Sequence, residues 1–362
     1  MNPLQTQLAR RRLLLGITNV GFWVLVAAGG LWTLLRCSPD TITPRTLALV
    51  LAGAVVVQAG FDLVGGFVLM LAPRPSPGRF LARWLPGVLV HTLVLGAVGW
   101  LSVTSFRLTG GFVPAVVVAT AGLAWARHSL LAAAGGTATA AGAWQGEPVL
   151  VADASDPAFT GGIVGRGRRA TSLLPAAWAG GLPAGEVAAE ARRRRWQIER
   201  GLPDRAFLLI LGWNVLGTAA GAFVSGYAGR SVEQALLLHA CWMTLWTFAS
   251  LLLLPSLSRR AVFAADRAAL DAGDDPRAWI ERFPTLVGED GAANGLVQTI
   301  FYPVPSARER RERLDRPAAP GFVPGNLARN NLYYSWAVCT LLGRAVHCNV
   351  GRPELWVFPP SV

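Results

Sequence analysis

The sequence predicts a mainly α fold: a polytopic helical membrane protein with about six transmembrane helices and a small cytoplasmic α+β domain. Of its 362 residues, 52% are hydrophobic and only 15% are charged, whereas soluble domains average roughly 25% charged residues. Several apolar runs are long enough to cross a bilayer. Arginine clusters alternate with these runs, so that one topology places every cluster in the cytoplasm, as the positive-inside rule expects.

The net charge of +12 indicates cytoplasmic loops and contact with anionic lipid rather than nucleic acid. The chain has no zinc-finger spacing, no RNA-binding aromatic motif and no basic zipper, so no nucleic-acid partner is expected. The four cysteines, Cys37, Cys241, Cys339 and Cys348, form no close CxxC pair. They therefore predict neither a zinc ribbon nor a disulfide framework.

Four transmembrane helices are expected first, at residues 13–35, 46–72, 84–106 and 111–126. The triple arginine 10–12 precedes the first run and holds the amino terminus in the cytoplasm. This run is longer than the apolar core of a signal peptide and lacks an obvious cleavage site, so it is interpreted as a membrane span.

Polar residues inside these spans raise a second possibility. Gln58 and Asp62 lie in the second span and His91 in the third. Such residues are costly in a bilayer and usually face the interior of the bundle. A hydrogen-bonded structural role is the favoured interpretation. A transporter or channel is the alternative, and the inverted repeats that would support it are not detected.

A cytoplasmic insert follows the fourth span. The small residues at 135–145 indicate a flexible linker. Strand character returns at 147–153, a strand and turn are expected at 155–165, and a second short strand at 170–178.

Residues 182–201 predict a single helix. Pro183 suits its first turn, and Glu186 and Glu190 lie early, where the helix dipole favours negative charge. Four arginines, 192–195, occupy the later turns, and Gly201 is a natural stop.

Two further spans are expected at 206–228 and 235–254, the second ended by Pro255. The remainder looks soluble or surface-bound, and both termini are expected in the cytoplasm. Helices are predicted at 261–273, within 301–314 and at 331–347, a break at 290–294, a loop at 316–326 and a docked tail from 351. The chain therefore divides into 1–134, 135–205, 206–256, 257–315 and a carboxy-terminal extension, 316–362.

The order of these pieces resembles the HtpX and CAAX-prenyl-protease family of membrane zinc metallopeptidases. Residues 157–162, PAFTGG, resemble the family's N-A-F-x-x-G stretch, and Leu182 with Glu186 resembles the opening of its HExxH helix. Residues 265–267, ADR, resemble the end of its ExxAD motif. A final segment, 305–314, resembles T-H-P-S-x-x-x-R-x-x-x-L. The resemblance covers about residues 110–315 and implies a metallopeptidase-like cytoplasmic domain.

The chain departs from the family pattern where the chemistry would be. Arg193, Arg194 and Gln197 stand at the three positions of HExxH, and Val262 stands at the glutamate of ExxAD. Val304 replaces the histidine of the last motif. A catalytic zinc needs about three nitrogen or carboxylate ligands and an open position for water. Arginine has no lone pair to give, and the general base is also missing.

We therefore expect a pseudopeptidase of the inner (plasma) membrane that binds a protein or peptide partner without hydrolysing it, with no catalytic residue and no cofactor. Its degenerate active-site positions are Arg193, Arg194, Gln197, Val262 and Asp266. The arginines at 192–195 are expected to pair with Asp266, Glu186, Glu190 or Glu199.

Two metal sites remain as alternatives. One is an active endopeptidase whose metal site has no recognisable motif and is built from residues such as His239, His347 and Asp266. The other is a structural metal at Cys339, His347 and Cys348, where residues 339 and 347 would lie about two turns apart on the helix expected at 331–347.

Overall fold

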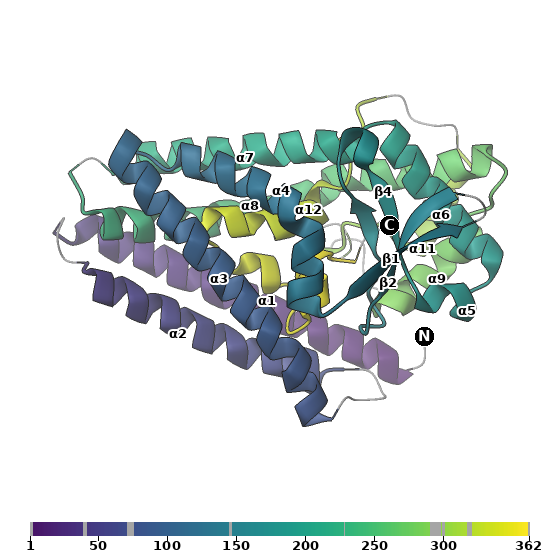
Figure 1. Ribbon diagram of the computed structural model, residues 1–362, viewed down its shortest axis with the longest axis horizontal. Coiled ribbons are helices and arrows are strands. Elements are labelled where there is room, and N and C mark those ends of the chain that lie inside the picture. Colours follow the sequence, from purple (N-terminus) through teal and green to yellow (C-terminus); the bar gives the residue numbers. More distant parts are fainter. Residues whose placement is uncertain are drawn as a thin grey trace.

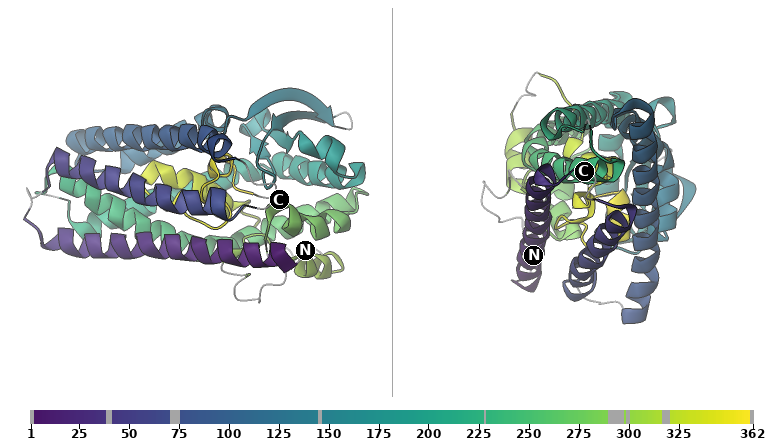
Figure 2. Two further views of the ribbon diagram at one scale, coloured as in Figure 1. Left: turned by 90° about the horizontal axis from the view of Figure 1, so that it is seen from below. Right: turned by 90° about the vertical axis from the view of Figure 1, so that its left-hand side faces the viewer.

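The computed structural model describes residues 3–38, 42–70, 76–144, 147–227, 229–289, 298, 301–316 and 321–360. Long helices form an elongated bundle, and a small sheet with shorter helices packs at one end of it (Figure 1). Both ends of the chain lie toward this end of the bundle, which we call the sheet end (Figures 1 and 2).

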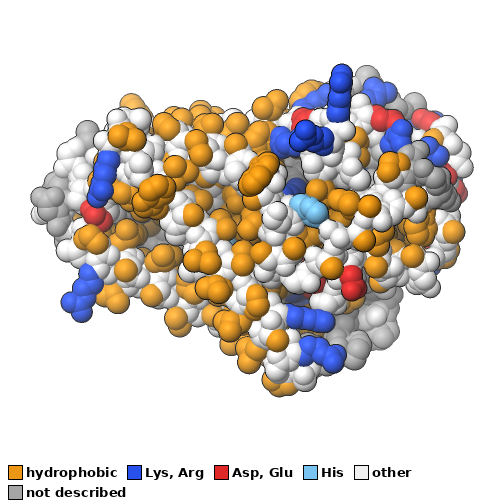
Figure 3. Space-filling view, in the orientation of Figure 1, with side chains coloured by type: hydrophobic (Ala, Val, Ile, Leu, Met, Phe, Trp, Pro, Cys, Tyr) orange, Lys and Arg blue, Asp and Glu red, His pale blue; other side chains and the backbone are white. Residues whose placement is uncertain are grey.

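Among the described residues, six helices are long and apolar enough to cross a membrane, which agrees with the predicted number of spans. They are α1 (Pro3–Arg36), α2 (Pro44–Leu63), α3 (Pro77–Thr109), α4 (Val113–Gly135), α7 (Leu202–Ser225) and α8 (Val232–Asp271). A π-helical turn, η1 (Val64–Val68), extends α2. Hydrophobic side chains cover much of the bundle's surface, and charged side chains gather mainly at the sheet end (Figure 3). The protein is thus a multi-pass membrane protein.

The helices extend beyond the apolar runs that predicted them. Helix α1 begins at Pro3, so the triple arginine expected before the first span lies inside the helix, with Arg12 buried. Helix α4 continues to Gly135, well past the predicted end at residue 126. Arginine and alanine are good helix formers, so the loss of hydrophobicity at a membrane boundary does not end a helix.

Pro255 does not end the sixth span, contrary to the prediction. Helix α8 continues through it to Asp271, and the helix expected separately at 261–273 is the end of α8. A proline removes one backbone hydrogen bond. Here α6, α7 and α12 pack along α8 and keep its two halves in one continuous helix.

The sheet has four strands in the order β1-β2-β4-β3. The strands are β1 (Ala138–Trp144), β2 (Glu147–Asp153), β3 (Gly162–Val164) and β4 (Thr171–Pro175). Strands β2 and β4 are parallel, whereas the β1–β2 and β3–β4 pairs are antiparallel. The predicted strand at 147–153 is confirmed. The linker prediction for 135–145 is wrong, because this stretch pairs with β2 from Ala138↔Asp153 to Trp144↔Glu147.

Short helices surround the sheet. They are α5 (Ala177–Gly181), α6 (Ala184–Glu199), α9 (Arg277–Val287), α11 (Ala307–Leu314) and a 3-10 turn, η2 (Gly167–Arg169). Helices α6 and α11 were predicted and α9 was not. The break expected at 290–294 lies outside the described residues.

The carboxy-terminal segment lies among the long helices, where Figures 1 and 2 show it in yellow. It comprises α12 (Leu327–Tyr334), η3 (Ser335–Val338), η4 (Leu342–Arg344) and α13 (Pro353–Val357). The single helix predicted at 331–347 is not formed, because Cys339 takes a left-handed conformation with φ 58°. The predicted docking of the tail is confirmed, since Leu355, Trp356 and Val357 are fully buried.

Candidate functional site

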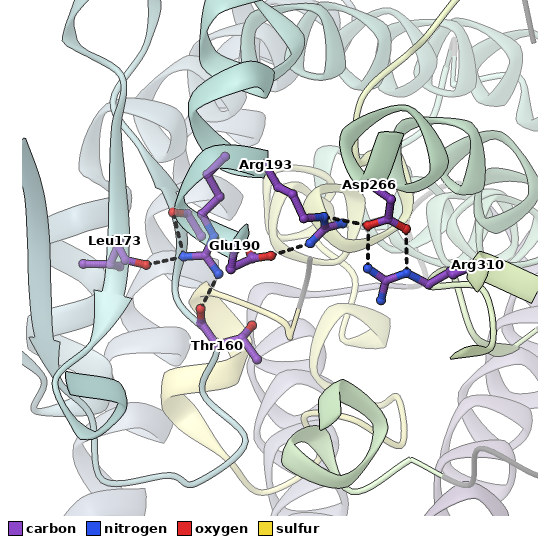
Figure 4. A network of polar contacts seen from close by, with 8 residues as sticks. Thr160, Leu173, Glu190, Arg193, Asp266 and Arg310 are labelled. Atoms are coloured by element: carbon purple, nitrogen blue, oxygen red, sulfur yellow. Dashed lines mark hydrogen bonds and ion pairs between the residues drawn. The ribbon is translucent and has the colours of Figure 1, made fainter. Parts of the chain in front are cut away.

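Helix α6 packs against the sheet-end part of α8, and this contact places an arginine of α6 on a carboxylate of α8 (Figure 4). The Nε of Arg193 lies 2.7 Å from Oδ1 of Asp266. Arg310, from α11, donates two hydrogen bonds to the same carboxylate, from Nε at 2.8 Å and from Nη2 at 2.7 Å. Asp266 is thus held between two guanidinium groups.

Glu190 joins this cluster from one turn earlier on α6. It accepts hydrogen bonds from Arg193 and, at 2.7 Å, from the Nε of Arg194. The guanidinium of Arg194 lies against the sheet and donates to the carbonyl oxygens of Thr160 and Leu173, each at 2.6 Å. The two neighbouring arginines therefore bind opposite sides of the site.

The cluster is closed to solvent and carries a net positive charge. Glu190, Arg193, Arg194, Asp266 and Arg310 are each at most 2% exposed, so three cations face two anions. Burial alone would lower the pKa of Arg193, but Asp266 and Glu190 outweigh it and raise that pKa. For Arg194, burial dominates and lowers the pKa despite Glu190. The carbonyl oxygens supply the remaining negative potential.

The stretch before β3 shapes the pocket for Arg194. Gly161 adopts a left-handed φ of 71°, and a Cβ there would lie 1.9 Å from the carbonyl oxygen of Leu173. Only glycine lets the chain approach β4 this closely. Phe159, fully buried, packs edge-on against Phe358 of the carboxy-terminal segment. Residues 157–162 thus supply the Thr160 carbonyl group that Arg194 binds and pack closely against Leu173, which supplies the other.

The other two predicted site positions lie on either side of the cluster. Val262 is one helical turn before Asp266 on α8 and belongs to a buried apolar cluster with Val187 and Val304. Gln197 is one turn after Arg193 on α6 and lines a cavity on the sheet side. Arg193 and Asp266 are in contact, Val262 contributes an aliphatic surface, and Gln197 lines the cavity together with Arg194 of the cluster.

The arginine pairings expected from the sequence are found for Asp266, Glu190 and Glu199. Arg195 binds Glu199 on the surface at 2.6 Å. Glu186 instead accepts two hydrogen bonds from Arg282 on α9. Arg192 pairs with Asp274, just beyond the end of α8.

A cavity of about 440 Å³ adjoins the cluster. Its walls come from α4, β3, the turn η2, α6, α7, α12 and the chain after α13. Five arginines line it: Arg127, Arg166, Arg169, Arg194 and Arg329. We call this cavity the arginine cavity.

The polar residues of the second and third spans bind the carboxy-terminal segment. Asp62 accepts hydrogen bonds from Arg344 and from the backbone N–H of Gly351, and Arg344 also contacts Nδ1 of His91 at 3.0 Å. Gln58 donates to Asp62 and accepts from Trp23. All three predicted intramembrane residues are thus engaged in packing the interior, as the structural interpretation expected.

The alternative metal sites are not assembled. His239 and Asp266 lie 27 residues apart (266 − 239) on the single helix α8, which corresponds to ~40 Å. Cys348 Sγ accepts a hydrogen bond from Arg329 at 2.6 Å, and His347 lies 3.9 Å from Glu289. Among the described residues, no three His, Cys, Asp or Glu side chains gather closely enough to hold a metal ion.

Sequence reasoning missed the second set of ion pairs that fixes the carboxy-terminal segment. Arg352 binds both oxygens of Asp156. Glu354 accepts hydrogen bonds from the backbone N–H groups of Ser155 and Asp156, at 2.9 and 2.8 Å. These partners lie almost 200 residues apart in the sequence, so no local pattern pointed to them.

No protein-family model matches the sequence, and no curated protein matches it either.

Proposed function

We propose that this protein is a metallopeptidase-like membrane protein without hydrolytic activity, which binds a protein or peptide partner that it does not cleave. The observation that carries the proposal is the ion pair of Arg193 with Asp266 between α6 and α8. In the HtpX-like pattern, Arg193 stands where the first histidine of HExxH would be. A permanent cation occupies this position and is paired with Glu190 and Asp266.

The placement of Asp266 supports the scaffold half of the proposal. A metal-bound histidine usually donates its other ring N–H to a carboxylate behind it. Asp266 contacts the side chain at position 193 as such a carboxylate would contact the histidine. Arg310 in turn donates a hydrogen bond to Asp266. Packing of α6 against α8 is a requirement of the proposed scaffold, and the two helices meet at these residues.

The electrostatics support the loss of metal binding. The buried cluster already holds three arginines against two carboxylates, so a divalent cation would add charge of the same sign at low dielectric. Val262 and Gln197 offer no carboxylate or imidazole to compensate. In the HtpX-like pattern, Arg194 stands at the position of the glutamate that would act as general base toward a metal-bound water.

Strand β1 is the place we propose for the partner. It is an edge strand of sequence ATAAGAW, with largely exposed side chains. Edge strands are usually protected from pairing by charged residues, proline or bulges, and β1 has no charged residue and no proline. A peptide segment can extend the sheet there by backbone hydrogen bonding.

The charge distribution supports an inner-membrane location with the sheet end in the cytoplasm. Four arginines lie at the opposite end of the bundle: Arg36, Arg45, Arg107 and Arg230. Most of the remaining described arginines lie at the sheet end. Arginine-rich segments remain cytoplasmic under the positive-inside rule.

The proposed metallopeptidase-like scaffold can be tested by restoring the zinc ligands of the HtpX-like pattern. A variant carrying R193H, R194E, Q197H and V262E has the complete HExxH and ExxAD residues. We expect it to purify with about one zinc per chain, whereas the wild type binds none and leaves an unfolded protein substrate uncut. The matched control is R193A, R194A, Q197A and V262A, which removes the same side chains without adding ligands.

Two outcomes would count against the proposal. One is chelator-sensitive proteolysis by the wild-type protein. The other is a folded restored variant, judged by size-exclusion chromatography and thermal melting, that holds no more zinc than the alanine control. For the partner, a photo-crosslinking residue at Ala141 on β1 is expected to give a discrete adduct that the same residue at Arg168 does not give.

A further inference from the structure

We propose that the arginine cavity binds the phosphate of an anionic phospholipid from the leaflet at the sheet end. The inference rests on the charge and the position of the cavity and on the neutral partners of its Arg127. It does not depend on the proposed loss of hydrolysis, because the residues that carry it are separate from the Arg193–Asp266 pair.

The charged side chains that line the cavity are all positive. Its described lining contains five arginines and no aspartate or glutamate. Three of these arginines have carboxylate partners outside the lining: Arg166 with Asp204, Arg194 with Glu190 and Arg329 with Glu289. Arg127 and Arg169 have no carboxylate partner among the described residues. At least two positive charges in the cavity are therefore uncompensated.

The guanidinium group of Arg127 is held by neutral hydrogen-bond acceptors, so its positive charge is not balanced. Its guanidinium donates to the side-chain oxygen of Asn330 and to the carbonyl oxygen of Val357, and it lies over the ring of Phe358 at 4.2 Å. These contacts fix the group without balancing its charge. Arginine's fork of donors matches the oxygens of a phosphate.

The position of the cavity favours a lipid as the source of that phosphate. Two walls are membrane helices, α4 and α7, and the opposite wall is the edge strand β3 with the turn η2. Trp125 of α4 lines the cavity and is 89% exposed. Tryptophan at such a boundary prefers the headgroup region of a bilayer.

The surroundings and size of the cavity agree with this source. Figure 3 shows arginine side chains of the sheet end directly beside the hydrophobic surface of the bundle. The volume of about 440 Å³ is in the range of ligand pockets. Basic pockets between membrane helices are known sites for anionic headgroups.

The test compares two phospholipids with the same acyl chains and different headgroups. The full-length protein in detergent is titrated with phosphatidylglycerol or phosphatidylcholine, and bound lipid is counted by native mass spectrometry. We expect phosphatidylglycerol to bind about tenfold more tightly, with a preference that falls as ionic strength rises.

Two neighbouring arginines give a matched pair of variants. Arg169 and Arg168 both lie in η2 and are exposed, but only Arg169 lines the cavity. R169E is expected to reduce the preference to about twofold or less, and R168E to leave it unchanged. R127Q is expected to act like R169E, provided that its melting temperature shows a folded protein.

Several outcomes would overturn the proposal. Equal affinity for the two lipids would do so, as would equal effects of R168E and R169E. Full displacement of the lipid by millimolar inorganic phosphate would identify a free anion as the ligand. Tighter binding of an acidic peptide than of phosphatidylglycerol would identify a protein ligand. Because none of these measurements involves zinc or proteolysis, their failure is distinguishable from failure of the proposed function.

Discussion

At the scale of single residues, Asp266 decides the stability of the buried cluster. It is 1% exposed and is the carboxylate shared by Arg193 and Arg310. A buried charge is tolerated only when it is paired. Removing the shared partner leaves two arginines that cannot reach water.

We predict that D266N lowers the free energy of unfolding by about 3–5 kcal/mol, measured as a drop in the melting temperature in detergent. The control is D274N, which removes the partner of Arg192 in a pair that is partly exposed on both sides. Such a pair contributes less than about 1 kcal/mol. A D266N variant as stable as D274N would show that the cluster is not energetically important.

Gly161 offers a second prediction at this scale, because its Cβ position is occupied by a carbonyl oxygen. We predict that G161A costs more than about 2 kcal/mol, since it combines a left-handed backbone with a Cβ contact of 1.9 Å. Gly167 is the control: its φ is also left-handed, at 52°, but its Cβ would meet nothing within 4 Å. G167A should cost only about 1 kcal/mol, so similar melting temperatures for the two variants would contradict the argument.

At the scale of elements, the carboxy-terminal segment is attached to the sheet end by ionised groups. Arg352 binds Asp156, and Glu354 accepts backbone N–H donors beside it. Burial would raise the pKa of Asp156, but Arg352 outweighs it and lowers the pKa below the ordinary aspartate value. Burial and the charge of Asp156 raise the pKa of Glu354.

The sign of the pH effect follows from the lowered pKa of Asp156. Its contribution to stability is fully present above the unfolded-state pKa of about 4 and is lost as the pH falls through the lower folded-state pKa. We predict that D156N melts at a lower temperature than wild type at pH 7 and that the difference shrinks below about pH 4. Melting curves of both proteins from pH 7 to pH 3 measure this difference. A constant difference across that range would rule out the ionised pair as its cause.

The sequence predicted elements well where one physical signal dominates. Six apolar runs gave six spans, because the bilayer imposes length and composition directly. The sequence pattern predicted the wrong structure where tertiary contacts determine the secondary structure. Residues 138–144 look flexible in isolation and become β1 only because β2 lies beside them. The helix expected at 331–347 breaks at Cys339, inside a segment packed among the bundle helices.

The candidate site was predicted only in part, because some of its contacts follow from a local sequence pattern and others depend on tertiary packing. A pattern on α6 and α8 indicated that Arg193 and Asp266 belong together, and they are in contact. The direction of Arg194 was not predictable, because its partners are backbone carbonyls of the sheet. The arginine cavity was likewise beyond reach, since its arginines come from four separate segments of the chain.

At the scale of the whole molecule, the carboxy-terminal segment gives the bundle a polar interior. Arg344 joins Asp62 of α2 to His91 of α3. The intramembrane carboxylate that made a transporter an alternative is therefore neutralised by the chain's own arginine. The contact fixes the membrane helices relative to the sheet end, so the two ends of the molecule are expected to face opposite sides of the membrane.

The orientation of the bundle can be tested with a cysteine that the chain already carries. Cys37 follows the end of α1, at the end of the bundle away from the sheet, and is partly exposed. Cys348 is buried and binds Arg329, and Cys241 and Cys339 pack among apolar side chains. Cys37 is thus the thiol best placed to react with a reagent that does not cross membranes.

We predict that a membrane-impermeant maleimide labels the wild-type protein in intact spheroplasts and that C37S abolishes the labelling. Adding R168C to C37S places a thiol on the exposed turn η2 at the sheet end, and this variant should be labelled only after the membrane is opened. The positive-inside rule requires this result, because the arginine-rich end must remain in the cytoplasm. The opposite orientation would be shown by two results together: labelling of the C37S/R168C variant before lysis, and no labelling of Cys37 in the wild-type protein. The arginine cavity would then lie in the outer leaflet of that membrane.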